Sequence, residues 1–428
     1  MIVDEIRWQA YRLPLQSGAP PGRATDDASV CGLLLCLRSA DGQTGVGEYP
    51  LKGRAHPDVW DALLWSVDAG RRLLGLDLDG FRDSRRGQGL AHRKLLRVIF
   101  GDSRPPAVFA WETALLDLWG RLHNQPLVEL LGGVRHPIPV NLLITASQPE
   151  PAAEQAASAH REGFNCLKCK VGRRSLADDV SLIQAVREAA GPDAKLRVDA
   201  NGAWNLDQAL EAVDMLAPFD IAYIEQPLPP GDLSAMTEIN RRSPIPVAAD
   251  EAVVSLAAAQ EIVNREAASV LIVKPARVGL SEAADIVRWS QIKNIPCVLT
   301  SMIESGVGLA ASAHVAGLLP PTGPPCGLAT ARLLVDDLLD TPLAVENGKL
   351  TLPDQPGLGI ALKNESVETY GIEPQGRRKY RQRLPGPAEP RPRRSPGSSP
   401  PTGRRRDRSG PRPPRDQGGA RPTPPPAG

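Results

Sequence analysis

The chain has 428 residues, with 50 Lys and Arg against 49 Asp and Glu and a formal net charge of +1. Its hydrophobic share of 42% supports a large buried core, which excludes a wholly disordered or fibrous protein. No stretch approaches the roughly 20 apolar residues of a membrane span, no signal-peptide pattern opens the chain, and six scattered cysteines form no disulfide framework. We therefore expect a globular protein of the cytoplasm.

Residues 1–130 predict an α+β domain. Apolar residues recur at helical spacing over Ala107–Arg121, after a region of strand patterns. We expect this unit to cap a second domain, with the segment 343–365 returning to complete it. The expected strands are Ile2–Leu15, Cys31–Arg38 and Thr44–Tyr49.

Residues 131–342 repeat one pattern eight times, a short β-branched or apolar run followed by a helical segment, at intervals of about 25 residues. This alternation predicts a (β/α)₈ TIM-type barrel. The alternative, a doubly wound open sheet, is disfavoured because no glycine-rich nucleotide loop follows an early strand. The expected strands are Val140–Ile144, Cys166–Val171, Leu196–Ala200, Ala222–Gln226, Val247–Asp250, Val270–Lys274, Cys297–Ser301 and Gly327–Thr330.

The C-terminal segment has a different composition. Residues 376–428 hold 15 Lys and Arg, 3 Asp and Glu, 14 Pro and 8 Gly, so we expect this Arg- and Pro-rich tail to be disordered. Its charge of +12 offsets −11 on the rest of the chain. One hypothesis gives the tail a role in binding nucleic acid or an acidic partner. The scarcity of aromatic residues among its arginines argues against base stacking, and a passive extension is the simpler interpretation.

Charged residues stand at the ends of five successive predicted strands. In barrels of this class the active site lies at the carboxyl ends of the strands. From Lys170 to Lys274 the charged positions follow one another at intervals of 29, 26, 25 and 24 residues, so we expect their side chains to meet at one mouth. The segments are Lys168-Cys169-Lys170, Asp199-Ala200-Asn201, Glu225-Gln226-Pro227, Asp250-Glu251 and Lys274-Pro275.

Three of these residues, Asp199, Glu225 and Asp250, are acidic. Carboxylates brought together in a partly dry pocket repel one another, and their pKa values would rise unless a cation were bound. An all-oxygen donor set favours a hard divalent ion, Mg²⁺ first and Mn²⁺ second. The competing interpretation, helix caps or salt bridges, suits a single acid better than three acids at this periodicity.

Two lysines, Lys168 and Lys170, are two residues apart on one predicted strand. Their side chains should therefore share a face, about 7 Å apart at the backbone. Neighbouring cations lower each other's proton affinity, which allows one lysine to act as a general base. Lys274 should face the same centre from the other side of the barrel. The pattern favours removal of a proton beside a carboxylate and stabilisation of the enediolate that results.

This series of motifs resembles the active-site residues of the enolase superfamily, in its muconate lactonizing enzyme subgroup. The resemblance covers residues 1 to about 365 and implies a Mg²⁺ site made of the three acidic residues. It also implies Lys170 as the acid/base, Lys168 supporting its low pKa and Lys274 as the opposing lysine. Further motifs that carry it are Gly45-Val46-Gly47-Glu48, Lys274-Pro275-Ala276-Arg277 and Pro356-Gly357-Leu358-Gly359.

Within this subgroup, Thr300–Gly308 and Cys326–Thr330 are most similar to o-succinylbenzoate synthases, the dehydratases of menaquinone and phylloquinone synthesis. The resemblance then implies a hydro-lyase in which Lys170 removes an α-proton and, once protonated, assists the syn loss of a β-hydroxyl. N-acylamino acid racemases and dipeptide epimerases of the same superfamily stay open as alternatives. The epimerases usually carry an Asp-x-Asp pair beyond strand eight, where this chain has Gly327-Leu328-Ala329-Thr330.

The expected substrate is a small dicarboxylate. The sequence leaves its exact identity, the oligomeric state and a second racemase activity open. The expected substrate contacts are Asn201, Ser301, Met302, Ile303, Gly327 and Leu328 from the barrel and Arg54 from a loop of the capping domain.

Overall fold

The computed structural model describes residues 2–16, 29–51, 70, 74–75, 105–372 and 380–383, the last four by their backbone. The chain divides into two units, Met1–Leu384 and Pro385–Gly428, and every described residue lies in the first. Arg54 and the chain beyond residue 383 therefore lie outside the described residues. In the part of the chain that is described, no helix is long and apolar enough to cross a membrane.

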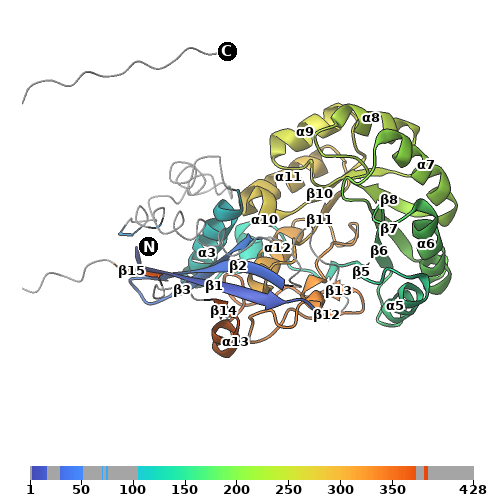
Figure 1. Ribbon diagram of the computed structural model, residues 1–428. Helices are drawn as coiled ribbons and strands as arrows, with labels where there is room; N and C mark the ends of the chain where they lie inside the picture. The colour runs from blue at the N-terminus through green and yellow to red at the C-terminus, as the bar shows by residue number, and fades with distance from the viewer. Residues whose placement is uncertain are drawn as a thin grey trace, which may run out of the picture. The chain divides into compact units, whose positions relative to one another are not determined.

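An antiparallel sheet near the N-terminus confirms the three predicted strands. It contains β1 (Val3–Pro14), β2 (Ser29–Ser39) and β3 (Thr44–Leu51), paired in chain order. Helix α3 (Pro105–His123) packs against this sheet (Figure 1). Gly47 allows that close approach, because a Cβ on it would lie 2.0 Å from the carbonyl oxygen of Ala110. This sheet and helix form the capping part of the molecule.

The C-terminal strands return to the same sheet. Both β14 (Gly371–Ile372) and β15 (Tyr380–Arg383) pair antiparallel with β1. Four residues of the predicted tail thus form a strand, which is too short to show in the composition of a 53-residue segment. The hairpin of β12 (Val345–Glu346) and β13 (Lys349–Leu350) pairs instead with β4 (Ile138–Pro139). The exact domain boundaries stay a prediction.

A curled parallel sheet of seven strands forms the barrel among the described residues, with the strands in sequence order. Because these strands are covered on both faces, they read in the sequence as short apolar runs, which is why their positions could be predicted. The strands are β5 (Leu142–Ile144), β6 (Cys166–Lys170), β7 (Lys195–Asp199), β8 (Ile221–Glu225), β9 (Val247–Ala249), β10 (Val270–Val273) and β11 (Cys297–Leu299).

The eighth position of the barrel is filled by only two residues. Gly327 N donates to Leu299 O at 2.9 Å, and Asn141 N donates to Cys326 O at 2.9 Å, so this segment joins the last strand to the first. The predicted eighth strand is thus shorter than expected, because the chain turns into the 3₁₀ helix η3 (Thr330–Leu333). The barrel closes all the same.

Helices alternate with the strands and cover the outside of the barrel (Figure 1). Side-chain caps explain several of their starts, for example Ser175 Oγ, which accepts from Asp178 N at 3.2 Å. The longer helices are α5 (Pro149–Arg161), α6 (Leu176–Ala190), α7 (Leu206–Leu216), α8 (Leu233–Arg242), α9 (Leu256–Asn264), α11 (Leu280–Ile292) and α12 (Gly306–Ala316). Short helical elements are α4 (Leu127–Leu130), η2 (Ala217–Phe219), α10 (Pro275–Val278) and α13 (Asn364–Thr369).

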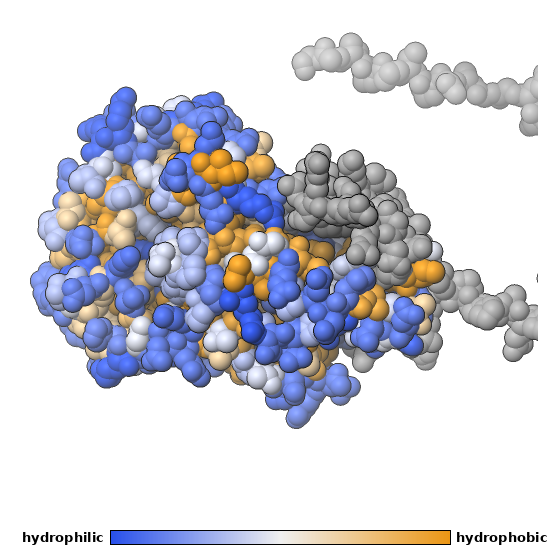
Figure 2. Space-filling model, turned by 180° about the vertical axis from the view of Figure 1, so that it is seen from behind, coloured by the Kyte–Doolittle hydropathy of each residue, from blue (hydrophilic) through white to orange (hydrophobic). Residues whose placement is uncertain are grey.

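The face of the molecule shown in Figure 2 is mainly hydrophilic, with hydrophobic residues in small groups.

Side chains alternate between the two faces of each barrel strand, which separates two hydrophobic clusters. Ile224 and Leu271 face the helices and belong to the large core. The residues next to them along each strand point into the barrel, so the charged residues at the strand ends point into its mouth. The interior cluster is Tyr223, Ala248, Val270, Ile272 and Val298.

His314 lies inside helix α12 with none of its surface exposed. Its Nδ1 accepts from Val128 N at 3.1 Å, which leaves Nε2–H to donate to Leu358 O at 3.1 Å. Burial lowers the pKa of His314 to about 4. The unfolded chain therefore takes up a proton below about pH 6.5 that the folded protein accepts only near pH 4. This contribution to stability is complete above pH 6.5 and is lost as the pH falls toward 4.

We expect the free energy of unfolding to fall between pH 7 and 4.5 by about 2 kcal/mol more in the wild type than in His314→Gln. The reason is that glutamine keeps a donor and an acceptor but does not titrate. Urea unfolding at the two pH values measures the difference. His160→Gln, which changes an exposed histidine, is the control and should keep the wild-type pH dependence. The same pH dependence in His314→Gln and wild type would contradict this assignment.

Candidate active site

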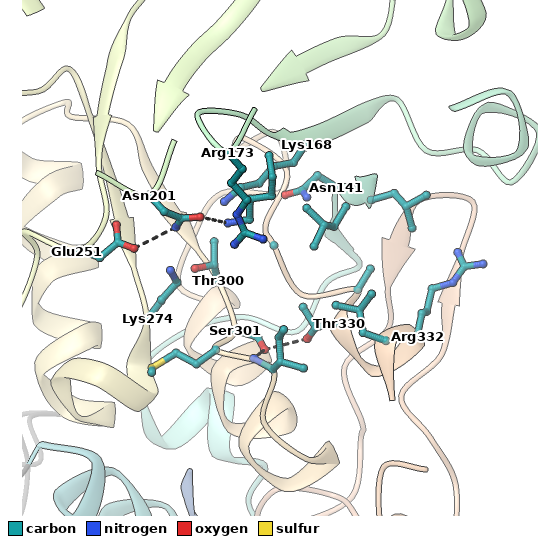
Figure 3. Close-up of a pocket in the computed structure, with 18 residues that line it drawn as sticks. Asn141, Lys168, Arg173, Asn201, Glu251, Lys274, Thr300, Ser301, Thr330 and Arg332 are labelled. Carbon is teal, nitrogen blue, oxygen red and sulfur yellow. Dashed lines mark hydrogen bonds between the residues drawn. The ribbon is translucent and has the colours of Figure 1, made fainter. Parts of the chain in front are cut away.

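The charged residues predicted at the strand ends do meet at one mouth of the barrel. Of these, Lys168, Lys170, Glu251 and Lys274 line a cavity of about 190 Å³, shown in close-up in Figure 3. Asp199, Glu225 and Asp250 do not line it and are buried in contact with the lysines. Polar residues from several strand ends converge on it, and apolar residues complete the wall. The lining residues are Asn141, Leu142, Leu143, Lys168, Lys170, Arg173, Asn201, Glu251, Lys274, Thr300, Ser301, Met302, Ile303, Gly327, Ala329, Thr330, Arg332 and Leu333.

On one side of the cavity the two lysines of β6 contact the acids of β7 and β8. The Lys168 ammonium lies 2.8 Å from Asp199 Oδ2 and 2.6 Å from Glu225 Oε2. The Lys170 ammonium lies 2.5 Å from the same Asp199 oxygen and 2.7 Å from Asn201 Oδ1. The parallel register explains this geometry, since Lys170, Asp199 and Glu225 are direct partners across the strands.

On the other side, Asp250 is the centre of a second group of charges. Its carboxylate pairs with the ammonium of Lys274 and, at 2.8 Å, with Arg277 Nη1. Arg277 also donates to the carbonyl oxygen of Asp250 at 2.6 Å. The adjacent Glu251 accepts from Asn201 Nδ2 at 3.0 Å, which links the two groups. Lysines therefore approach the cavity from β6 and from the end of β10.

The two lysines of β6 differ in proton affinity. Although burial disfavours its charged form, the carboxylates of Asp199 and Glu225 raise the pKa of Lys168 well above its ordinary value. Burial lowers the pKa of Lys170, where the attraction of Asp199 is opposed by the positive charge of Lys168. Lys170 is thus the lysine that more readily becomes a neutral amine. This difference agrees with the role in proton transfer expected for Lys170 from the sequence.

The three acids are suited to a hard cation. Asp199, Glu225 and Asp250 are each at most 1% exposed, and Glu225 Oε1 is buried without a hydrogen-bond partner among the described residues. Burial and the charge of Asp199 raise the pKa of Glu225 to about 7, so its ionised form lacks sufficient compensation. A divalent ion bound by these oxygens would supply it.

In the structure, the three acids of the described chain do not form a ready metal-binding cluster. Within the described residues, no group of three or more His, Cys, Asp or Glu side chains is arranged to hold a metal ion. The ammonium group of Lys168 pairs with Asp199 and Glu225, and that of Lys274 pairs with Asp250, so the lysines act as counterions of the three acids. The all-oxygen donor set and the Glu225 Oε1 atom without a hydrogen-bond partner fit Mg²⁺. The assignment of the three ligands stays a prediction.

Most of the predicted substrate contacts lie on this cavity. Asn201, Ser301, Met302, Ile303 and Gly327 line it. Leu328 is not among the lining residues: its side chain is fully buried in the large core, because it follows Gly327 by one residue along the chain. Arg54 lies outside the described residues. Lining residues missed from the sequence include Asn141, Arg173, Thr300, Thr330 and Arg332.

Arg173 differs from the arginines around it. Arg174 pairs with Asp179 at 2.9 Å, and Arg332 pairs with Glu162 at 2.6 Å. Arg173 is exposed and makes no ion pair or hydrogen bond with any residue that the structure describes. In Figure 3 its side chain reaches toward the middle of the cavity, whereas that of Arg332 points away from it. Arg173 is therefore available to an anionic group of a ligand.

Comparisons with known proteins agree with this fold and site. Residues 151–367 match the family described as Enolase C-terminal domain-like. An o-succinylbenzoate synthase of Thermobifida fusca is 39% identical over 219 residues, which cover 51% of this chain and 67% of that protein. An N-succinyl-L-Arg/Lys racemase of Bacillus cereus is 32% identical over 383 residues, 87% of this chain and 98% of that protein.

A solved structure matches over most of the chain. The crystal structure of N-succinyl Arg/Lys racemase from Bacillus cereus superposes with a TM-score of 0.78 at 26% identity. The match covers 90% of this chain and 100% of that one. Both an o-succinylbenzoate synthase and a racemase are thus among the relatives, and overall similarity does not separate the two activities.

Proposed function

This chain belongs to the enolase superfamily, and from that premise we propose that it is an o-succinylbenzoate synthase, a Mg²⁺-dependent hydro-lyase. The observation that carries the proposal is the placement of Lys170, with its lowered pKa, on a cluster of buried carboxylates at the mouth of the barrel. The relative from Thermobifida fusca and the absence of an Asp-x-Asp pair in the sequence Gly327–Thr330 favour the synthase over an epimerase.

The reaction uses the chain's own residues for proton transfer. A divalent cation held by Asp199, Glu225 and Asp250 would stabilise the negative charge that develops on the substrate carboxylate. The neutral amine of Lys170 takes the proton from the α-carbon. The resulting ammonium returns that proton to the β-hydroxyl as its carbon–oxygen bond breaks, so that water leaves and the double bond forms.

The other lysines provide charge and orientation. The high pKa of Lys168 keeps it cationic beside Lys170, which helps to hold Lys170 in its neutral form. Lys274 contributes a positive charge from the opposite side of the cavity. The alternative, an N-acylamino acid racemase, has a specific observation in its favour. Lys274 lies where a second proton donor would be needed, and the Bacillus cereus relative is a racemase.

We expect Arg173→Gln to raise KM for a dianionic substrate roughly 10- to 100-fold with kcat nearly unchanged. A charge-assisted hydrogen bond to a remote carboxylate contributes about 1.5–3 kcal/mol, and it is made equally in the ground state and the transition state. Steady-state kinetics measures the change. Arg161→Gln, at an exposed arginine that does not line the cavity, should have wild-type kinetics. An unchanged KM in Arg173→Gln would exclude this contact.

A substrate panel tests the proposal. The protein with Mg²⁺ is given the hydroxycyclohexadiene dicarboxylate precursor of o-succinylbenzoate, a set of N-succinylamino acids and a set of dipeptides. We expect the highest kcat/KM for the cyclohexadiene compound, with o-succinylbenzoate as product. Racemisation of N-succinylamino acids at a higher kcat/KM would select the alternative function, and turnover of dipeptides alone would reject both.

A further inference from the structure

The cavity wall made by Ser301, Met302 and Ile303 has an unusual backbone. Ile303 has φ of 69°, a left-handed conformation that β-branched residues rarely adopt because it brings the side chain against the backbone. The same residue lines the cavity. Such a conformation persists only when the surrounding structure holds it in place. The contacts that hold this segment therefore determine the shape of the cavity.

Local hydrogen bonds fix part of this wall. Ile303 N donates to Ser301 Oγ at 2.8 Å, and Thr330 Oγ1 is 2.8 Å from the same oxygen. Met302 N donates to Glu304 Oε1 at 2.8 Å. These bonds bind the wall to itself and to the neighbouring barrel segment. Two residues after the wall, Ser305 is bonded to a side chain of the capping sheet.

The carboxylate of Glu48 makes this contact. Glu48 belongs to β3 of the capping sheet and is completely buried. Its Oε1 accepts from Ser305 N at 3.0 Å, and its Oε2 accepts from Gly308 N at 2.8 Å and from the Ser305 hydroxyl. The hydroxyl of Tyr11, on β1, donates to Oε1. One side chain of the capping sheet thus ties down the start of α12, two residues beyond Ile303.

Space around this carboxylate is tight. A Cβ added to Gly308 would lie 3.0 Å from Glu48 Oε2 and 2.7 Å from the Cβ of Glu304. The side chain of Glu48, from the capping sheet, and that of Glu304, from the residue after the wall, therefore both pack against Gly308. These contacts place Glu48 next to Glu304, the residue that follows Ile303.

We propose that Glu48 is a positioning residue, which holds the strained wall Ser301–Ile303 and so couples the capping sheet to the substrate fit of the cavity. The proposal rests on the proposed function only in taking the cavity as the place where substrate binds. Glu48 touches neither the cavity nor the proposed catalytic groups, so its effect must pass through Ser305 and the residues before it.

Glu48→Gln is the main test, because glutamine keeps the size but replaces one acceptor oxygen with a donor. Hydrogen exchange of the segment 301–308 is measured first, since it needs no substrate. We expect at least tenfold faster exchange of the Ser305 and Gly308 amides. Glu5→Gln is the matched control: Glu5 is a buried glutamate of the same sheet that pairs with Arg7, and its replacement should leave this exchange unchanged.

The consequence for substrate is measured by kinetics. Glu48→Gln should raise KM at least tenfold with kcat changed less than threefold, and Glu5→Gln should leave both near wild type. In an Ile303→Gly background, where the strain is removed, Glu48→Gln should change KM less than threefold further. If Glu48→Gln does not fold, Gly308→Ala, which crowds the carboxylate from the other side, replaces it in both measurements.

Equal exchange in the Glu48 and Glu5 variants would overturn the proposal. Independent, multiplicative effects of Glu48→Gln and Ile303→Gly on KM would also overturn it, since they would show that Glu48 does not act through the strained residue. A wild-type protein that turns over no compound of the panel rejects the proposed function instead, and leaves the exchange measurement to decide the role of Glu48.

Discussion

Lys170→Ala is expected to lower kcat about 10⁴-fold, because the same amine takes the α-proton and returns it to the leaving hydroxyl. The fold should be retained, since the lysine is at the edge of the cavity and the neighbouring Lys168 still pairs with Asp199 at 2.8 Å. Steady-state turnover and circular dichroism together measure the result. The effect is the largest expected for any single substitution in the chain.

A matched lysine provides the control for this result. Lys195 is exposed and begins β7, the strand that ends in Asp199, so it lies at the opposite end of the barrel. Lys195→Ala should keep wild-type turnover. A loss below tenfold in Lys170→Ala would show that another group removes the proton and would reject the assignment of the base.

Lys274→Arg is expected to abolish racemisation of N-succinylamino acids, by at least 10³-fold, while dehydration falls by tenfold or less. Arginine keeps the positive charge beside Asp250 but does not give up a proton, so only a reaction that needs proton delivery from that side should stop. Parallel assays of the two reactions measure the split.

The control substitutes an exposed lysine in the same way. Lys293→Arg, just beyond α11, should change neither reaction. Equal loss of dehydration and racemisation in Lys274→Arg would mean that Lys274 has the same role in both reactions. The assignment of proton transfer in dehydration to Lys170 alone would then be wrong.

The sequence predicted the barrel because its physical cause is local. A parallel strand buried on both faces is a short apolar run, and each helix between two strands begins with its own capping signal. The last turn of the barrel and β15 were harder to predict for the opposite reason. Two residues at Cys326–Gly327 close the sheet, and four residues at Tyr380–Arg383 pair with a strand near the other end of the chain. Neither has a pattern long enough to stand out.

The site was predictable to a similar extent. Lys170, Asp199 and Glu225 could be placed together because parallel strands put equivalent positions at equal height. The alternation of side chains also explains why Gly327 lines the cavity whereas Leu328 lies in the large core. The motif Gly45-Val46-Gly47-Glu48 was visible in the sequence, but the partners of Glu48 were not, since Ser305 and Gly308 are 257 and 260 residues away. Its contacts with the segment before α12 are visible only in the folded chain.

The most direct test of the central claim is the formation of o-succinylbenzoate from its cyclohexadiene precursor by protein treated with a chelator, before and after addition of Mg²⁺. We expect negligible product before the addition and full turnover after it. Turnover at the same rate without metal, or no product with saturating Mg²⁺, would contradict a metal-assisted removal of the α-proton at this site.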